Sequence, residues 1–194
     1  MFFKRKYEFK PDRTEGSFLK KLYLTPLQRK RILKWSLITL VLVALSLVQD
    51  VVLSQISIAG ATFALVPCGI LICAMLFDPE TAAVFSLISS TIYYFSGTAP
   101  GVYVILILTI LGTFLCMFRW GYLQRRFSTM YLCAAAAMMG YIFLVFLMGC
   151  FFKNTTWDRL SIFLITGGLS VAVMPILYPV FSAISNIGGS TWKE

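Results

Sequence analysis

One stretch constrains the fold more than any other. From Trp35 to Val48 the chain carries no charge, and a cluster of basic residues precedes this run. The cluster is Arg29, Lys30, Arg31 and Lys34, whereas Gln49 and Asp50 follow the run. A helix over residues 35–53 would be about 28 Å long, close to the ~30 Å hydrocarbon core of a bilayer. The stretch therefore predicts a membrane-spanning helix whose basic end faces the cytoplasm.

The composition extends this prediction to the whole chain. Of its 194 residues 59% are hydrophobic, and its mean hydropathy is +0.83. Charged residues make up 13%, against about 25% in soluble proteins. These values predict an integral membrane protein of the all-α class, a polytopic bundle of transmembrane helices that forms one domain.

The positive charge is concentrated near the start of the chain. The formal net charge is +9, and eleven of the 17 Lys and Arg residues lie at or before Lys34. Such a distribution is typical of the positive-inside signal of membrane proteins and does not indicate nucleic-acid binding. It leaves open a second interpretation, contact of the basic residues with anionic lipid or with an acidic partner.

The apolar segments divide the chain into three parts. Residues 1–34 are expected to form a basic cytoplasmic arm, with a possible interfacial helix around 18–23 and a helix start at Thr25-Pro26. Residues 188–194 form a short polar tail. The region between them, 35–187, is predicted to cross the membrane six times, which puts both termini in the cytoplasm. The first span is too long for a signal-peptide core, so we expect it to remain. The expected spans are 35–53, 60–77, 79–95, 102–118, 128–152 and 160–187.

Several local signals lie within these spans. Pro67 predicts a kink or break in the second span, and Pro175 with Pro179 predicts a strongly bent sixth span or two half-helices. These bends would open grooves in which a partner helix could pack. Asp78-Pro79-Glu80 favours a tight turn with Asp78 as helix cap, so the second and third spans should form an antiparallel hairpin. Two further features are candidates for helix packing and turn formation: the small residues Ala82, Ser86 and Ser90, and the glycines Gly97 and Gly101.

The sequence offers few groups for chemistry inside a membrane. It contains no histidine, and the acidic residues outside the arm and the tail stand at the ends of the predicted spans: Asp50, Asp78, Glu80 and Asp158. We therefore expect no catalytic, cofactor-binding or metal-binding residue, and no enzymatic activity. The cysteines lie in apolar stretches and are interpreted as small buried side chains. Serine and threonine residues of the spans could line a polar path, although helix packing explains them as well; they are Ser46, Ser86, Ser89, Ser90 and Thr91.

The order of these features resembles the MreD family of bacterial rod shape-determining membrane proteins. The segment from Leu47 to Gly60 resembles the end of the family's first span, and Pro67 stands where the family has a proline that opens the second. Residues 96–101 resemble its serine-glycine turn, and Pro175 to Pro179 its last span. The chain departs from the family pattern at Tyr93 and Tyr94, where an acidic residue is common, in its third span, which is less rich in glycine, and in its longer basic arm.

The resemblance implies a function and a set of partners. An MreD-like protein is a scaffold of the cell-wall elongation machinery in the bacterial cytoplasmic membrane. It binds a bitopic MreC-like protein and, with it, a SEDS glycosyltransferase and a penicillin-binding protein above an actin-like filament. The family is similar in shape to the S components of energy-coupling-factor vitamin transporters. An S component is therefore the alternative, although the first span offers only Ser36, Ala44 and Ser46 as small docking residues, without four-residue spacing.

Overall fold

The computed structural model describes residues 26–185 apart from 54, 59 and 123–126. The basic arm before residue 26, including the expected interfacial helix and the Thr25 cap, and the tail 188–194 lie outside the described residues. The described part is helical, and its one bridge, between Ile58 and Ala61, is isolated and forms no strand. The main helices are α1 (Pro26–Leu47), α2 (Leu65–Leu76), α3 (Pro79–Phe95), α4 (Tyr103–Tyr122), α5 (Phe127–Phe151) and α6 (Leu160–Ser185).

The first helix begins earlier than the apolar run that defines it. α1 starts at Pro26, and proline is favoured in the first turn because its missing N–H has no intrahelical partner there. The helix ends at Leu47 and continues as a π-helical turn, η2 (Val48–Leu53). The helix start expected at Thr25-Pro26 is thus confirmed at Pro26, and the helical segment ends at Leu53, the end expected for the first span.

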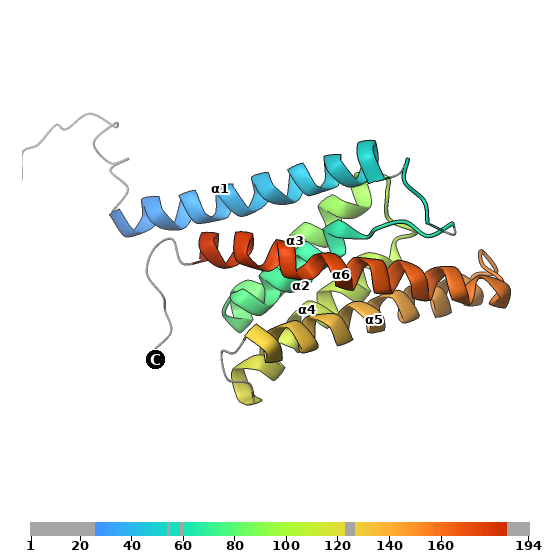
Figure 1. Ribbon diagram of the computed structural model, residues 1–194. Coiled ribbons are helices and arrows are strands. Elements are labelled where there is room, and N and C mark those ends of the chain that lie inside the picture. The colour runs from blue at the N-terminus through green and yellow to red at the C-terminus, as the bar shows by residue number, and fades with distance from the viewer. Residues whose placement is uncertain (1–25, 54, 59, 123–126, 186–194) are drawn as a thin grey trace, which may run out of the picture.

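Successive helices alternate in direction along one long axis (Figure 1). α1, α3 and α5 run one way, and α2, α4 and α6 run back. As a result, the start of α1 and the end of α6 lie at the same end of the bundle. We call this the basic end, because Arg29, Lys30 and Lys34 lie in the first part of α1, and we call the other the far end.

α2 forms the centre of the bundle. All twelve of its residues are buried, and it contacts α1, α3, α4, α5 and α6. Because it begins at Leu65, Pro67 is its third residue and lies in the first turn. The predicted kink at Pro67 is therefore wrong, since proline in the first turn removes no intrahelical hydrogen bond. The expected span of 60–77 begins five residues too early.

α2 and α3 form the antiparallel hairpin that the sequence predicts. Phe77 and Asp78 connect them, and Pro79 takes the first position of α3. The backbone N–H of Ala82 donates to the Asp78 carbonyl at 2.7 Å, and the Thr81 hydroxyl donates to the same oxygen at 2.9 Å. Asp78 is the N-cap residue of α3, as predicted, but its side chain makes no capping hydrogen bond. The turn therefore depends on its backbone geometry.

α3 and α4 approach closely through small residues. Ala82, Ser86 and Ser90 are all fully buried. Ser86 lies against Gly112 of α4, where a methyl group at residue 112 would overlap the Ser86 hydroxyl and come within 3.3 Å of Ala74 on α2. The Ser90 hydroxyl lies 3.4 Å from that of Thr109. Small side chains at these positions bring three helix backbones together.

α6 runs without a break through both of its prolines (Figure 1). It extends from Leu160 to Ser185 with Pro175 and Pro179 inside it. The alternative of two half-helices is therefore wrong. In a bundle, neighbouring groups can satisfy the carbonyls that proline leaves without a donor, so a proline need not end the helix.

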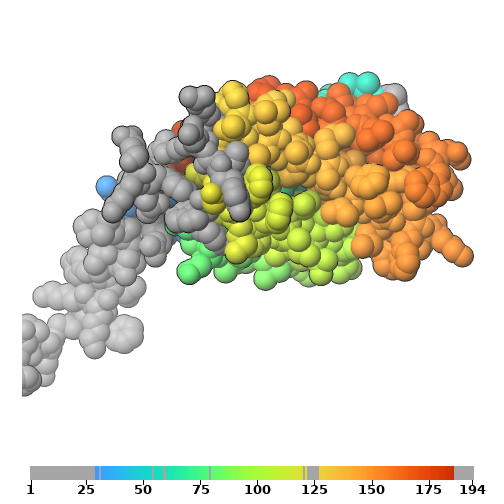
Figure 2. All heavy atoms as spheres, turned by 90° about the horizontal axis from the view of Figure 1, so that it is seen from below, coloured from blue at the N-terminus to red at the C-terminus, as the bar shows by residue number. Residues whose placement is uncertain are grey.

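The outward surface of the bundle is apolar. α4 and α5 lie side by side on the face shown in Figure 2. Phe114, Leu132 and Phe151 are 62%, 65% and 79% exposed. Within the described residues, three segments are long and apolar enough to cross a membrane: Ile32–Leu53, Phe127–Phe151 and Trp157–Ser185. Leu65–Leu76 and Tyr103–Arg119 are shorter apolar helices.

We predict that Gly112→Ala destabilises the bundle by about 1–3 kcal/mol, because the added methyl group overlaps the Ser86 hydroxyl. Ser86→Ala should be close to neutral, since this hydroxyl has no hydrogen-bond partner among the described residues, and it should partly rescue Gly112→Ala. Thermal unfolding in mild detergent measures these effects. Gly140→Ala on α5 is the control, because its added methyl group meets no atom within 4 Å. Equal effects at Gly112 and Gly140 would contradict the packing.

Candidate functional site

An aromatic cluster joins α1 to the α2–α3 turn at the basic end. The Trp35 ring stacks on that of Phe77 with a centroid distance of 5.2 Å and an interplanar angle of 14°. Phe85 contacts both rings, at 5.8 Å from Trp35 and 5.1 Å from Phe77. The Lys34 ammonium lies 5.1 Å from the centroid of Phe77, a cation–π distance. This cluster fixes the basic end of α1 against the bundle.

The predicted basic residues have different environments. Arg29 and Lys30 are exposed, whereas Lys34 is half-buried against Phe77. The side chain of Arg31 is not among those that the structure describes. Arg119, which directly follows the expected fourth span 102–118, lies in the last turn of α4 and is only 5% exposed. A cation there is favoured by the negative end of the helix dipole. Arg29 and Lys30 are therefore the members of the cluster that face outward.

Two side chains accept hydrogen bonds from backbone amide groups at the buried start of α2. The Val66 N–H donates to Oε1 of Gln49, and the Ala64 N–H donates to Oγ of Ser170, both at 3.0 Å. The Ser170 hydroxyl in turn donates to the Thr166 carbonyl at 2.6 Å. Amide groups at the start of a helix have no intrahelical acceptor, and Val66 is buried. Gln49 of η2 and Ser170 of α6 thus make this buried helix start possible.

A tyrosine pair lies beside Gln49 at the far end. Tyr93 and Tyr141 are 4% and 2% exposed. The Tyr93 hydroxyl interacts with the side chains of Gln49, Thr98 and Tyr141. This group connects η2, α3, α5 and the loop after α3. The sequence indicates Tyr93 only as a departure from a family pattern, and nothing in its spacing predicts that it meets Tyr141.

A long groove separates α1 from α3. It has a volume of about 570 Å³. Val66 and Phe85, both 3% exposed, lie at its base. Exposed residues of both helices form its rims: Val43 and Leu47 on α1, and Ile88, Ile92 and Phe95 on α3. Its polar lining residues are Thr39, Ser46, Asp50, Ser89, Tyr93 and Ser96.

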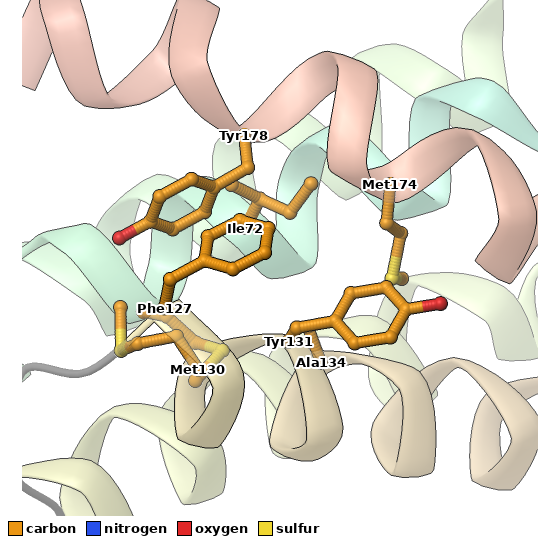
Figure 3. Close-up of a pocket in the computed structure, with 8 residues that line it drawn as sticks. Ile72, Phe127, Met130, Tyr131, Ala134, Met174 and Tyr178 are labelled. Atoms are coloured by element: carbon orange, nitrogen blue, oxygen red, sulfur yellow. The ribbon is translucent and has the colours of Figure 1, made fainter.

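A second cavity lies between α2, α5 and α6 and is far smaller (Figure 3). Its volume is about 10 Å³, at the lower limit of what one water molecule needs. Phe127 and Tyr178 meet edge to face at its border, with ring centroids 5.1 Å apart. Met130 and Met174 also line it. We interpret this cavity as a packing feature of the core.

The cysteines take part in packing. Cys68, Cys73 and Cys116 are buried, and Cys133 and Cys150 are half-buried. The Cys116 thiol donates to the Phe77 carbonyl at 3.0 Å and so contacts the α2–α3 turn. The Cys68 thiol lies 3.5 Å from the Ser170 carbonyl. In the described part of the chain, no group of three or more Cys, Asp or Glu residues is placed to hold a metal ion.

The remaining predicted residues lie apart from the groove. Ala82, Ser86 and Ser90 face α4 inside the bundle, and Pro175 and Pro179 lie in α6. Gly97 has a φ of +82°, which glycine adopts without strain, and so it closes the turn after α3. Gly101 lies against the Tyr103 ring. The structure therefore does not bring the predicted set into one site. The sequence does not predict the groove, because a space between two helices corresponds to no local sequence pattern.

Over the residues that the structure describes, these features define an all-helical protein, and three of its helical segments are long and apolar enough to cross a membrane. No protein-family model, no curated protein and no solved structure matches this chain.

We predict that Gln49→Leu destabilises the bundle by about 1–3 kcal/mol, because it leaves the buried Val66 N–H without its acceptor. Gln55→Leu, the same change at an exposed residue of the following loop, should have little effect. Thermal unfolding of both variants in the same detergent compares them. A Gln49→Leu variant as stable as Gln55→Leu would show that the amide does not stabilise α2.

Proposed function

We propose that this protein is a membrane scaffold that binds a partner helix along α1. The supporting observation is the exposure of α1. Among its described side chains only Ile38 is buried, although its apolar part is long enough to cross a bilayer. A membrane helix with one buried residue contributes little to the core of its own bundle. Its outward face is therefore available to another helix.

The outward face of α1 has a suitable shape. Ser36, Leu40, Ala44 and Val48 are exposed and follow one another at intervals of four residues. They lie on the outward side of the helix, where they border the groove rim formed by Val43 and Leu47. Small residues such as Ser36 and Ala44 let a second helix approach closely, and van der Waals contact drives association in lipid. We assign the partner helix to this face.

The proposed topology has six spans with both termini in the cytoplasm. Its support is the alternating direction of the six main helices and the basic cluster at the end where α1 starts and α6 ends (Figure 1). Under the positive-inside rule this end faces the cytoplasm. Arg29 and Lys30 would then meet the anionic lipids of the inner leaflet.

The identity of the partners comes from the MreD resemblance. It suggests a bacterial cytoplasmic membrane and a single-span MreC-like protein as the occupant of the α1 face. It also suggests a complex with a SEDS glycosyltransferase and a penicillin-binding protein, and thus a role in peptidoglycan synthesis and rod shape. We assign binding to this chain and catalysis to those partners.

A second candidate function has one observation in its favour. The groove volume of about 570 Å³ falls within the 300–1,000 Å³ typical of small-molecule sites. A solute-binding S component of a vitamin transporter would have such a cavity. The groove is open along its length to the surroundings of the helices, as the exposure of its rims shows. A groove that is open to the surroundings of the helices suits a ligand dissolved in the membrane better than a vitamin taken from water.

For the topology we predict that Lys30→Cys and Pro100→Cys, in a background without other cysteines, react with a membrane-impermeant maleimide from opposite sides. Both residues are exposed and lie toward opposite ends of the bundle. In intact cells only Pro100→Cys should be labelled, and Lys30→Cys should react after the membrane is opened. Labelling of Lys30→Cys in intact cells would contradict the orientation.

For the function we predict that depletion from a rod-shaped host gives round cells. A single-span protein should co-purify with the wild-type chain in mild detergent, and Leu40→Trp should reduce its recovery by about tenfold or more, a loss of ~1.4 kcal/mol. Leu132→Trp on α5 is the matched control, because Leu40 and Leu132 are 63% and 65% exposed. Normal cell shape together with lost vitamin uptake would contradict the scaffold and favour the S component.

A further inference from the structure

The groove between α1 and α3 is long and narrow. On α1 its lining extends from Trp35 to Asp50, which at 1.5 Å per residue is about 22 Å. The space open to the centre of a water molecule is about 570 Å³, and the whole space between the walls and the open side is about 1300 Å³. Over about 22 Å the mean cross-section is therefore at most about 59 Å². The groove therefore runs through most of the ~30 Å thickness of a hydrocarbon core.

This cross-section selects the kind of occupant. An α-helix with side chains is 10–12 Å wide, so its cross-section is about 80–110 Å². Carbon atoms in contact are about 4 Å apart, so an extended hydrocarbon chain has a cross-section of about 20 Å². One hydrocarbon chain fits the groove, whereas a helix does not.

The polarity of the lining changes along the groove. Toward the basic end the walls are Trp35, Leu42 and Phe85. The Thr39 hydroxyl there already donates to the Trp35 carbonyl at 3.0 Å. Toward the far end lie Asp50, Ser46 and Ser96. An amphiphile would place its chain between the apolar walls and its polar head at the far end.

The charges at the two ends favour one type of head. The Asp50 carboxylate lines the far end of the groove, where it attracts a cation and repels an anion. At the other end, Lys34 directly precedes Trp35 in the sequence, and its ammonium lies over Phe77, which stacks on Trp35. An ammonium head is therefore attracted at the far end and repelled at the basic end.

We propose that the α1–α3 groove binds one hydrocarbon chain of an amine-headed membrane lipid, a phosphatidylethanolamine, with its head at Asp50. The lipid enters sideways between the exposed rims Val43 and Ile88. It fills the space between α1 and α3, which contact each other in the aromatic cluster. The rim residues Val43 and Leu47 border the outward face of α1. Lipid binding is measured on the chain alone and does not depend on the partner helix.

Native mass spectrometry of the full chain, released from mild detergent, tests the proposal. The probes are phosphatidylethanolamine, phosphatidylcholine and phosphatidylglycerol with identical acyl chains. We expect one phosphatidylethanolamine per chain, held about tenfold more tightly than phosphatidylglycerol. Asp50→Asn should reduce this preference to about twofold or less without loss of lipid binding. A wild-type chain that binds phosphatidylglycerol as well as phosphatidylethanolamine would overturn the proposal.

Two substitutions test the location. Val43→Trp and Ile88→Trp fill the groove from opposite walls and should each reduce lipid occupancy by about tenfold. Val180→Trp on α6 is the matched control, since Val180 and Val43 are 45% and 46% exposed, and it should retain the lipid. Equal occupancy in all three variants would place the lipid elsewhere. If both groove variants fail to fold, the headgroup preference of the wild-type chain still decides the outcome.

Discussion

The structure depends on the burial of α2 and on the hydrogen bonds that make its burial possible. All twelve residues of this helix lie inside the bundle. A helix can begin in an apolar interior only if its first amide groups find acceptors, since each one left without a partner costs about 1–3 kcal/mol. Gln49 and Ser170 provide two acceptors at 3.0 Å. They come from η2 and from the interior of α6, so the start of α2 is bonded to two segments that are distant from each other in the sequence.

The position of α2 determines what the other helices can do. Because α2 occupies the centre, α3 to α6 pack around it through small residues such as Ser86 and Gly112, and their outer sides remain apolar. α1 packs on α2 and α6, with Leu42 and Leu45 against Gly69 of α2. The aromatic cluster at Trp35 fixes its basic end, and the Gln49 hydrogen bond fixes η2, which continues it. The groove separates this part of α1 from α3. The central position of α2 therefore leaves two surfaces on α1, the proposed partner face and one wall of the proposed lipid groove.

Much of the fold could be predicted from local signals. Pro79 fixes the start of α3, and apolar runs locate α4, α5 and α6 to within a few residues. Predictions failed where a contact distant in the sequence decides the outcome. The Gln49 acceptor lets α2 begin at Leu65 rather than near 60, and packing inside the bundle buries Arg119. The groove could not be predicted, because it arises from the distance between α1 and α3. Six spans, the partners and the function remain predictions.

The central claim is that this chain is a membrane bundle built around a buried α2. A photoactivated carbene probe dissolved in the bilayer tests it directly, because the probe inserts into any side chain that meets the hydrocarbon core. In lipid nanodiscs, peptides from Ile32–Leu53 and Phe127–Phe151 should be labelled strongly, whereas Leu65–Leu76 should remain unlabelled. Labelling of Leu65–Leu76 at the level of Ile32–Leu53, or no labelling of the chain, would contradict the account.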